Sequence, residues 1–353
     1  MHKHKQSQCK RKVKHRKNVM GLIIFCITVC IVFMFAYYQN LRKEISVRQE
    51  WLETVLTREK KWILENQGPE GEIYMNGSKA GDVNPYFACM AALGLLAETK
   101  NCPMTETEQK AVGRYLDWHT GVLLETDGKM GIYRKEGGEL IYKEKADSED
   151  GYLGMYLFLM GKYLEKTEST DLPESWKNGI SLALKKIQSL MQDGITQVSE
   201  ENTTVYLMDN LEVWKGLYEL ELAGLEDTQA ISEIRKKIQK QIEKIFWDDA
   251  NQRWRIIGNS DRYHQTEFYP DGVAQIYPLI YEFPVKEKKK QKVLYDQFTE
   301  RFQWQKLNKK RTGFLWAMTG MAAAQMRDIN NLVELVGNYE TEYCKKRKYP
   351  LYT

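Results

Sequence analysis

The sequence predicts an all-α protein whose main domain is an α/α toroid, two concentric rings of helices, preceded by one transmembrane helix. Three observations support this class. Helical periodicity dominates the chain beyond residue 41, helices with one apolar stripe alternate with helices that are apolar nearly all round, and a charge-free segment precedes them. Fully apolar helices must be buried, so the alternation predicts a buried inner ring wrapped by an amphipathic outer ring.

Composition sets the limits of this interpretation. The 353 residues are 42% hydrophobic and 28% charged, which is typical of a globular protein and excludes a disordered, collagenous or multi-span membrane chain. The net charge is +4, but the first 18 residues hold eight Lys or Arg and no acid. The remaining 44 basic and 48 acidic residues leave the rest near −4. The basic pI therefore reflects the tail and does not argue for nucleic-acid binding.

The anchor is predicted at residues 19–38, a stretch of 20 residues without a charge. As a helix it is long enough to cross a hydrocarbon core of about 30 Å. A cleaved signal peptide is the alternative, but that needs a small-residue cleavage site, and residues 34–38 are bulky. The positive-inside bias keeps the basic tail cytoplasmic. We therefore expect a cytoplasmic tail at 1–18, a signal anchor at 19–38, a juxtamembrane linker helix at 39–58 and an extracytoplasmic toroid domain at 59–353.

The helices follow in order from the periodicity. Ile231, Ile234, Ile238, Ile242 and Ile245 form a single stripe typical of an outer helix, whereas 152–164 is apolar on every side and typical of an inner one. Outer helices are expected at 44–66, 105–121, 172–192, 228–247, 288–303 and 328–346. Inner helices are expected at 84–98, 149–166, 206–223, 270–282 and 312–326. A twelfth helix is missing or irregular, and the segments 71–74, 128–133 and 254–257 could form short strands.

Cysteine and glycine patterns indicate no cofactor. Six cysteines show no CxxC pair and no metal-ligand spacing, and no glycine-rich phosphate loop occurs. We therefore expect neither a disulfide framework, a metal nor a cofactor.

Acidic residues recur where the inner helices begin. They are Asp82, Asp147, Asp150, Asp209 and Asp271, with steps of 65, 62 and 62 residues from Asp82 to Asp147, Asp209 and Asp271. Inner helices of a toroid start at the same mouth, so these acids would converge on one cleft. The alternative is that each is simply an N-cap, because an Asp oxygen accepts the unpaired N–H groups of a helix start.

Amides and aromatic residues accompany these acids. Carboxylates and amides that bond hydroxyls, among aromatic faces on which sugar rings stack, predict a carbohydrate cleft. The candidate sugar-contacting residues are Asn84, Tyr86, Asp147, Asp150, Tyr152, Tyr206, Asn210 and Tyr269.

The pattern resembles the six-hairpin glycosidases, and most nearly glycoside hydrolase family 8. In that family a general-acid Glu precedes the first inner helix, and Asp82 in Asp82-Val-Asn-Pro-Tyr86 occupies the similar place here. The family also has an Asp-rich run before an apolar helix, which residues 146–152 resemble. The resemblance implies Asp82 as the acid and Asp147 or Asp150 as the carboxylate that positions the sugar. It covers residues 60–330, with Asp in place of the family's Glu.

These residues predict a mechanism. An inverting glycosidase needs a protonated carboxyl and an ionised carboxylate about 6.5–9.5 Å apart. Burial near Pro85 and Tyr86 would raise the pKa of Asp82, whereas a helix N-terminus favours an ionised base. We expect Asp271 as base, with Asp209 in reserve, and reassign Asp271 as nucleophile if the pair is too close for a water.

The expected protein is a membrane-anchored extracytoplasmic glycoside hydrolase. It is expected to hydrolyse a β-linked cell-surface glycan or exopolysaccharide with inversion of configuration at the anomeric carbon. The negative outer domain favours neutral or amino sugars over strongly anionic glycans. Two alternatives stay open. One is a non-catalytic glycan-binding or scaffold protein of an exopolysaccharide synthesis complex, and the other is a polysaccharide lyase using His119 or His264.

Overall fold

The computed structural model describes residues 46–75, 81–137, 139–169, 171–225, 228–258, 267–285, 288–308, 312 and 316–344. The chain divides into two compact units, Met1–Leu56 and Thr57–Thr353. In the first unit, residues 46–56 are helical. The predicted tail at 1–18 and anchor at 19–38 lie outside the described residues. Within the described part of the chain, no helix has the length and apolar character needed to cross a membrane.

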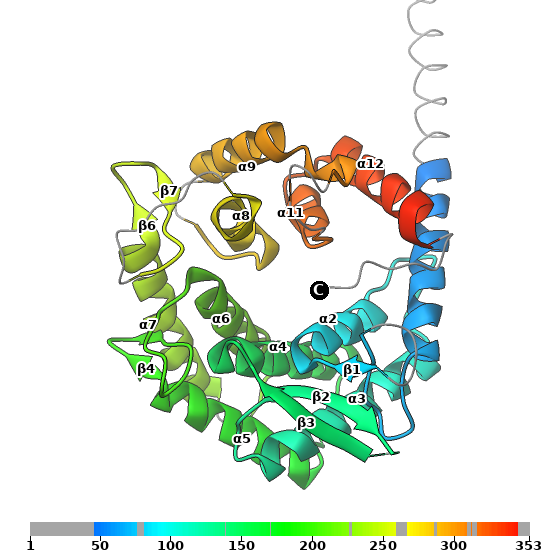
Figure 1. Ribbon diagram of the computed structural model, residues 1–353, viewed down its shortest axis with the longest axis vertical. Coiled ribbons are helices and arrows are strands. Elements are labelled where there is room, and N and C mark those ends of the chain that lie inside the picture. Colours follow the sequence, from blue (N-terminus) through cyan, green and yellow to red (C-terminus); the bar gives the residue numbers. More distant parts are fainter. Residues whose placement is uncertain are drawn as a thin grey trace, which may run out of the picture. The chain divides into compact units, whose positions relative to one another are not determined.

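The second unit starts with helical residues 57–65 and continues as alternating outer and inner helices (Figure 1). The outer helices are α3 (Glu106–Glu125), α5 (Glu174–Ser189), α7 (Thr228–Phe246), α9 (Lys288–Phe302) and α12 (Ile329–Tyr339). The inner helices are α2 (Pro85–Leu96), α4 (Glu149–Thr167), α6 (Leu207–Leu222), α8 (Val273–Ile280) and α11 (Thr319–Gln325). The predicted order of helices is confirmed.

Burial follows the two sequence patterns. Helix α4 is buried almost continuously from Glu149 to Gly161. Helix α7 instead buries one stripe, which includes Ile231, Ile234, Ile238 and Ile242. Apolar side chains stabilise the fold only where they are buried away from water. Helix α4 therefore requires neighbouring elements on every side, whereas α7 requires them on one side.

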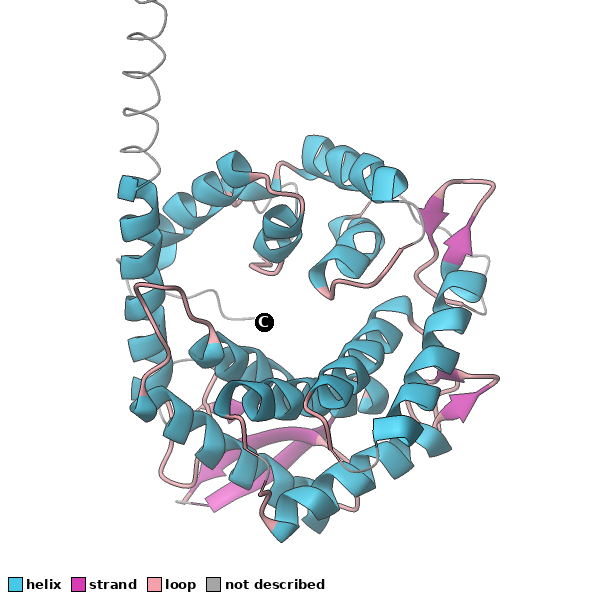
Figure 2. Cartoon of the chain, turned by 180° about the vertical axis from the view of Figure 1, so that it is seen from behind, coloured by secondary structure: helices cyan, strands magenta, loops and turns pink. Residues whose placement is uncertain are grey.

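Short strands connect the helices (Figure 2). They are β1 (Asp82–Val83), β2 (Gly131–Glu136), β3 (Glu139–Lys145), β4 (Met191–Gln192), β5 (Ile195–Thr196), β6 (Trp247–Asp248) and β7 (Arg253–Trp254). The irregular turns are η1 (Phe268–Gly272), η2 (Trp304–Lys306) and η3 (Glu340–Cys344). The first three strands form an antiparallel sheet in the order β1-β2-β3. The predicted strand near 128–133 is β2 and that near 254–257 is β7, whereas 71–74 contributes a single bridge from Ile73 to Gln67.

Helices α4 and α6 approach closely because glycine lies at their crossing. A Cβ atom on Gly154 would lie 2.6 Å from the backbone nitrogen of Val213, and one on Gly216 would lie 2.3 Å from the carbonyl oxygen of Gly154. Any larger residue would push the two helices apart. The contact fixes Glu212, one residue before Val213, on the part of α6 that faces α4.

Candidate active site

The starts of three inner helices and the middle of a fourth surround a cavity of about 240 Å³, which we call the acidic cavity. Asn84 caps α2, Tyr152 lies in the first turn of α4, Asp209 in the first turn of α6, and Tyr277 on α8. The lining residues are Asn84, Tyr86, Phe87, Asp147, Ser148, Tyr152, Met208, Asp209, Glu212, Tyr269, Tyr277 and Trp316. The structure thus brings together six of the residues predicted for the site, namely Asn84, Tyr86, Asp147, Tyr152, Asp209 and Tyr269.

Glu212 is the most deeply buried acid of this cavity, with 2% of its surface exposed. Its Oε1 atom accepts hydrogen bonds from three phenol groups, Tyr277 at 2.6 Å, Tyr281 at 3.2 Å, and Tyr86. Burial raises the pKa of Glu212 to about 8, although the phenol hydrogen bonds oppose the shift. With that pKa, most Glu212 side chains carry a proton at neutral pH.

Asp209 lies one helical turn before Glu212 and is half-buried. Burial raises its pKa well above the usual range, and the nearby charges of Asp150 and Glu212 add to the increase. Among the described residues, no Lys or Arg forms an ion pair with Asp209 or Glu212. Desolvation is therefore not offset by a cation, and the protonated form is favoured.

Asp147 and Asp150 occupy different surroundings although three residues separate them. Asp147 is exposed and lines the acidic cavity. Asp150 is fully buried behind the lining residues, where it accepts hydrogen bonds from Ser148 Oγ at 2.8 Å and Thr196 Oγ1 at 2.7 Å. Burial raises the pKa of Asp150 to about 6. Of these two alternatives for a sugar-contacting carboxylate, only Asp147 reaches the cavity.

Asp82, the predicted acid, does not line the acidic cavity. Antiparallel pairing of β1 with β2 places it opposite Arg134, whose Nε atom donates at 2.6 Å, and Lys143 Nζ donates at 2.8 Å. The Arg134 guanidinium holds the pKa of Asp82 below its usual range. A proton donor needs the opposite shift, so the assignment of Asp82 as acid has to be replaced.

Asp271, the predicted base, is buried in a different cavity, of about 220 Å³. Its neighbours in that lining include Arg253, Gln275 and Arg301, and Tyr269 is the η1 residue that lines the acidic cavity instead. Asp82 and Asp271 therefore do not form a pair across the acidic cavity, and the predicted acid and base must both be reassigned.

Two further predicted residues have structural roles. Asn210 is fully buried, accepts a hydrogen bond from Thr196 N at 2.9 Å and donates to the carbonyl oxygens of Thr196 and Tyr206. Tyr206 precedes α6 and forms a bridge with Ile257. Neither residue lines the acidic cavity.

His119 gives no support to a lyase. His119 is 1% exposed and lies outside the acidic cavity, with Nδ1 at 3.1 Å from the hydroxyl of Tyr115. Burial lowers its pKa to about 3. A base must reach the proton that it abstracts, which this core position prevents. His264 lies outside the described residues.

Glu212, Ser148, Phe87, Met208, Tyr277 and Trp316 line the cavity but were not predicted as site residues. The spacing of Asp209 and Glu212 is a usable signal, because residues three apart lie on the same face of a helix. The arrangement combines buried, proton-holding carboxyls, an exposed carboxylate and aromatic walls, which together allow proton transfer to and from a polar ligand.

Comparison with known proteins identifies the fold. No family model and no curated protein matches the chain. Solved structures do match, among them a wild-type glycosidase, at 12% identity and a TM-score of 0.58, covering 81% of this chain and 82% of that one. The glucoamylase of Saccharomycopsis fibuligera matches at 10% identity and a TM-score of 0.56, covering 84% and 81%. The chain therefore has the six-hairpin glycosidase fold, as the sequence predicts. The closer resemblance to family 8 stays a prediction.

Proposed function

We propose that the domain is a glycoside hydrolase whose active site is the acidic cavity. The observation that supports this most strongly is the combination of Asp209, a half-buried carboxyl with a raised pKa, and Asp147, an exposed carboxylate, in one aromatic-lined cavity. Glycoside hydrolysis needs a carboxyl that can donate a proton to the leaving oxygen and a second carboxylate on the other side of the sugar. A solved glycosidase with glucose bound has the same fold, at a TM-score of 0.57 and 11% identity.

Asp209 is the proposed general acid. Its burial keeps the proton that must pass to the glycosidic oxygen. Asp147 is the proposed base that activates a water, which gives inversion of the anomeric carbon. Glu212 lies one turn after Asp209 on the same helix. It accepts hydrogen bonds from Tyr86 and Tyr277 and so fixes the position of these two cavity-lining side chains.

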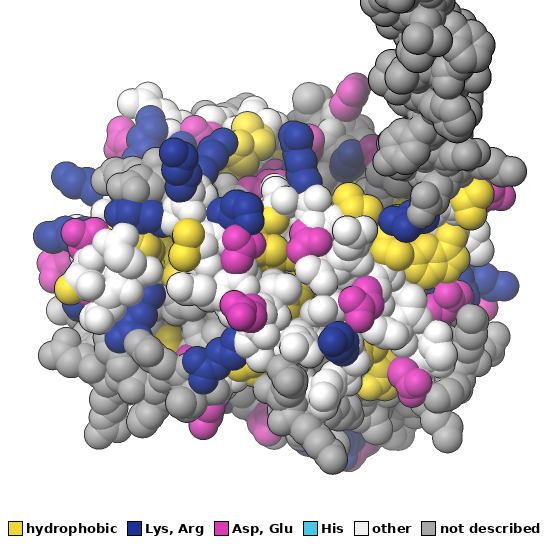
Figure 3. Space-filling model, turned by 90° about the horizontal axis from the view of Figure 1, so that it is seen from above, with side chains coloured by type: hydrophobic (Ala, Val, Ile, Leu, Met, Phe, Trp, Pro, Cys, Tyr) yellow, Lys and Arg dark blue, Asp and Glu magenta, His cyan; other side chains and the backbone are white. Residues whose placement is uncertain are grey.

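The proposed substrate is a neutral or amino-sugar glycan with β linkages. The lining residues of the acidic cavity include no Lys or Arg that could pair with an anionic sugar, whereas hydroxyl groups can hydrogen-bond with Asn84 and Asp147. Tyr86, Tyr269 and Trp316 offer aromatic surface for sugar rings. Acidic and basic side chains are interspersed on the face seen in Figure 3, which creates no single-sign field there. The proposed location is outside the cell membrane, with residues 19–38 as anchor.

The test is release of reducing sugar from a panel of glycans by the full-length protein in lipid nanodiscs. We expect turnover of at least one neutral or amino-sugar glycan, and a fall of roughly 10²–10⁴-fold in Asp209→Asn, because general acid catalysis contributes that much. Asp296→Asn is the matched control, since Asp296 is an exposed residue of α9 paired with Lys292.

Three other results would contradict parts of the proposal. Binding of a glycan without release of sugar would favour the scaffold function. An unsaturated product absorbing in the ultraviolet would indicate a lyase. Full turnover in Asp209→Asn together with loss in Glu212→Gln would move the role of acid to Glu212.

A further inference from the structure

A second and larger cavity adjoins the acidic cavity. It measures about 600 Å³ and lies among residues of α2 and α4 and the start of α11, and we call it the apolar cavity. Its lining includes Met90 and Leu93 of α2, Met155 and Phe158 of α4, and Met321 of α11. Apolar surface left open in a folded protein costs free energy, so a cavity of this kind and size indicates a binding function.

Phe87 and Trp316 line both cavities. The Trp316 ring stacks on Tyr277 at 5.5 Å, and Tyr277 donates to Glu212 in the acidic cavity. Tyr281 lines the apolar cavity and donates to the same Glu212 oxygen. The polar and apolar cavities therefore adjoin at Phe87 and Trp316, which belong to the lining of both.

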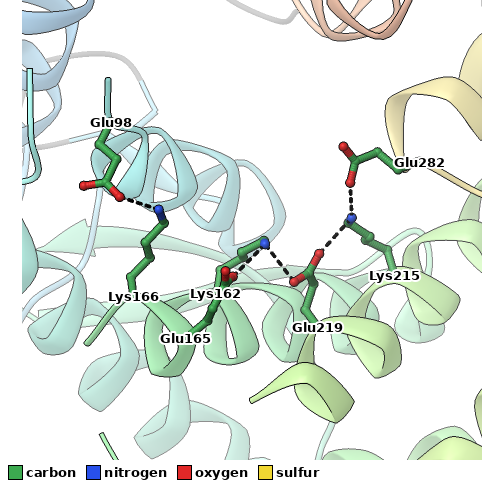
Figure 4. Close-up of polar contacts among 7 residues, drawn as sticks. All are labelled: Glu98, Lys162, Glu165, Lys166, Lys215, Glu219 and Glu282. Carbon is green, nitrogen blue, oxygen red and sulfur yellow. Dashed lines mark hydrogen bonds and ion pairs between the residues drawn. The ribbon is translucent and has the colours of Figure 1, made fainter. Parts of the chain in front are cut away.

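The charged side chains of the apolar cavity are already paired. Lys166 pairs with Glu98, and Lys162 pairs with Glu165 and Glu219 at 2.8 Å each (Figure 4). Both lysines of the lining are therefore already paired with carboxylates, which leaves neither of them to neutralise an anionic head group. The favoured occupant is a neutral apolar group. Methionine side chains are flexible and polarisable, and they adapt to chains of variable shape.

We propose that the substrate is a glycoside with an apolar aglycone, whose sugar binds in the acidic cavity and whose alkyl or aryl group binds in the apolar cavity. This inference rests on the proposed hydrolase function. An amphiphile matches two adjoining cavities of opposite polarity. Each methylene buried in the second cavity would raise affinity by up to about fourfold.

The experiment compares methyl, octyl and dodecyl glycosides of the same sugars, below the concentrations at which they form micelles, with full-length protein in nanodiscs. We expect kcat/KM to rise at least about tenfold from methyl to octyl. Two variants should abolish the rise and leave methyl glycoside turnover unchanged. Met321→Lys introduces a charge at a residue that is 44% exposed, and Met90→Trp fills the cavity. Val293→Lys, on α9 and 53% exposed, controls for partitioning into the nanodisc and should keep the rise.

The outcomes separate the two proposals. Hydrolysis that does not depend on chain length, or a dependence that survives in both cavity variants, overturns the inference and leaves the hydrolase. No hydrolysis at any chain length overturns the hydrolase and, with it, the aglycone. A concentration-dependent dimer that is lost in Met321→Lys but kept in Val293→Lys would assign the cavity to a second copy and also overturn the inference. Melting curves confirm that each variant is folded.

Discussion

The acidic residues near the two ends of helix α6 differ in whether they are paired with a cation. At the start, Asp209 and Glu212 have raised pKa values and, among the described residues, no cationic partner. One turn further on, Lys215 and Glu219 form a buried pair at 2.8 Å, and Glu219 also pairs with Lys162. Lys215 then pairs with Glu282, at the end of α8 (Figure 4).

The difference separates carboxyls that hold the ring together from carboxyls that do not. The second group joins α4, α6 and the end of α8, so its charges contribute to the native structure once they are paired. The first group is desolvated with no cation paired to it among the described residues, which disfavours the folded state whenever those carboxyls ionise. Residues kept at a cost to stability are typical of functional sites.

The largest expected effect on stability is at the paired end. Glu219→Gln leaves the buried Lys215 and the half-buried Lys162 short of a carboxylate and should lower the free energy of unfolding by about 3–5 kcal/mol. Glu165→Gln removes the more exposed partner of the same Lys162 and should cost less than about 1 kcal/mol. Urea unfolding of both variants measures the difference. Equal costs would show that Glu219 is not the centre of the network.

At the unpaired end, Glu212→Gln should stabilise the protein in a pH-dependent way. The folded pKa of Glu212 is about 8 against an ordinary 4.5. Its contribution to stability is therefore present below about pH 4.5, is lost as pH rises towards 8, and stays constant above. The loss is at most about 1.4 kcal/mol per pH unit in that window. The melting temperature of the variant should exceed that of the wild type at pH 8, and the gap should close at pH 5. A gap that is the same at both pH values would contradict the shift.

Asp82→Asn should have the smallest effect. The carboxylate pairs with Arg134 and Lys143, but both lysine and arginine side chains are more than a third exposed, so solvent screens the pairs. We expect a loss of less than about 1 kcal/mol and unchanged turnover per folded molecule. Loss of turnover without loss of stability would return Asp82 to the active site.

The sequence predicted the fold better than the site, for a physical reason. The periodicity of apolar residues shows how many faces of a helix are buried. It therefore predicts directly that α4 belongs to the inner ring and α7 to the outer ring. The recurrence of Asp at inner helix starts also led to Asp147 and Asp209, because helices of one ring begin at one mouth.

Charge partners could not be predicted in the same way. Arg134 reaches Asp82 through strand pairing across 52 residues, and the irregular η1 turn directs Tyr269 and Asp271 to different cavities. The raised pKa of Glu212 could not be predicted from the sequence, because the burial that causes it comes from packing against other elements. The three tyrosines around it belong to α2 and to α8 and its end, which become neighbours only in the folded chain.

At neutral pH the acidic cavity holds a protonated carboxyl on Glu212, whose pKa is raised to about 8. Infrared difference spectra between the wild type and Glu212→Gln measure this directly through the carbonyl stretch of protonated carboxylic acids. We expect a carboxylic acid band that is present in the wild type at pH 7, is absent in the variant, and titrates with a pKa near 8. A difference spectrum that shows only an ionised carboxylate at pH 7 would contradict it.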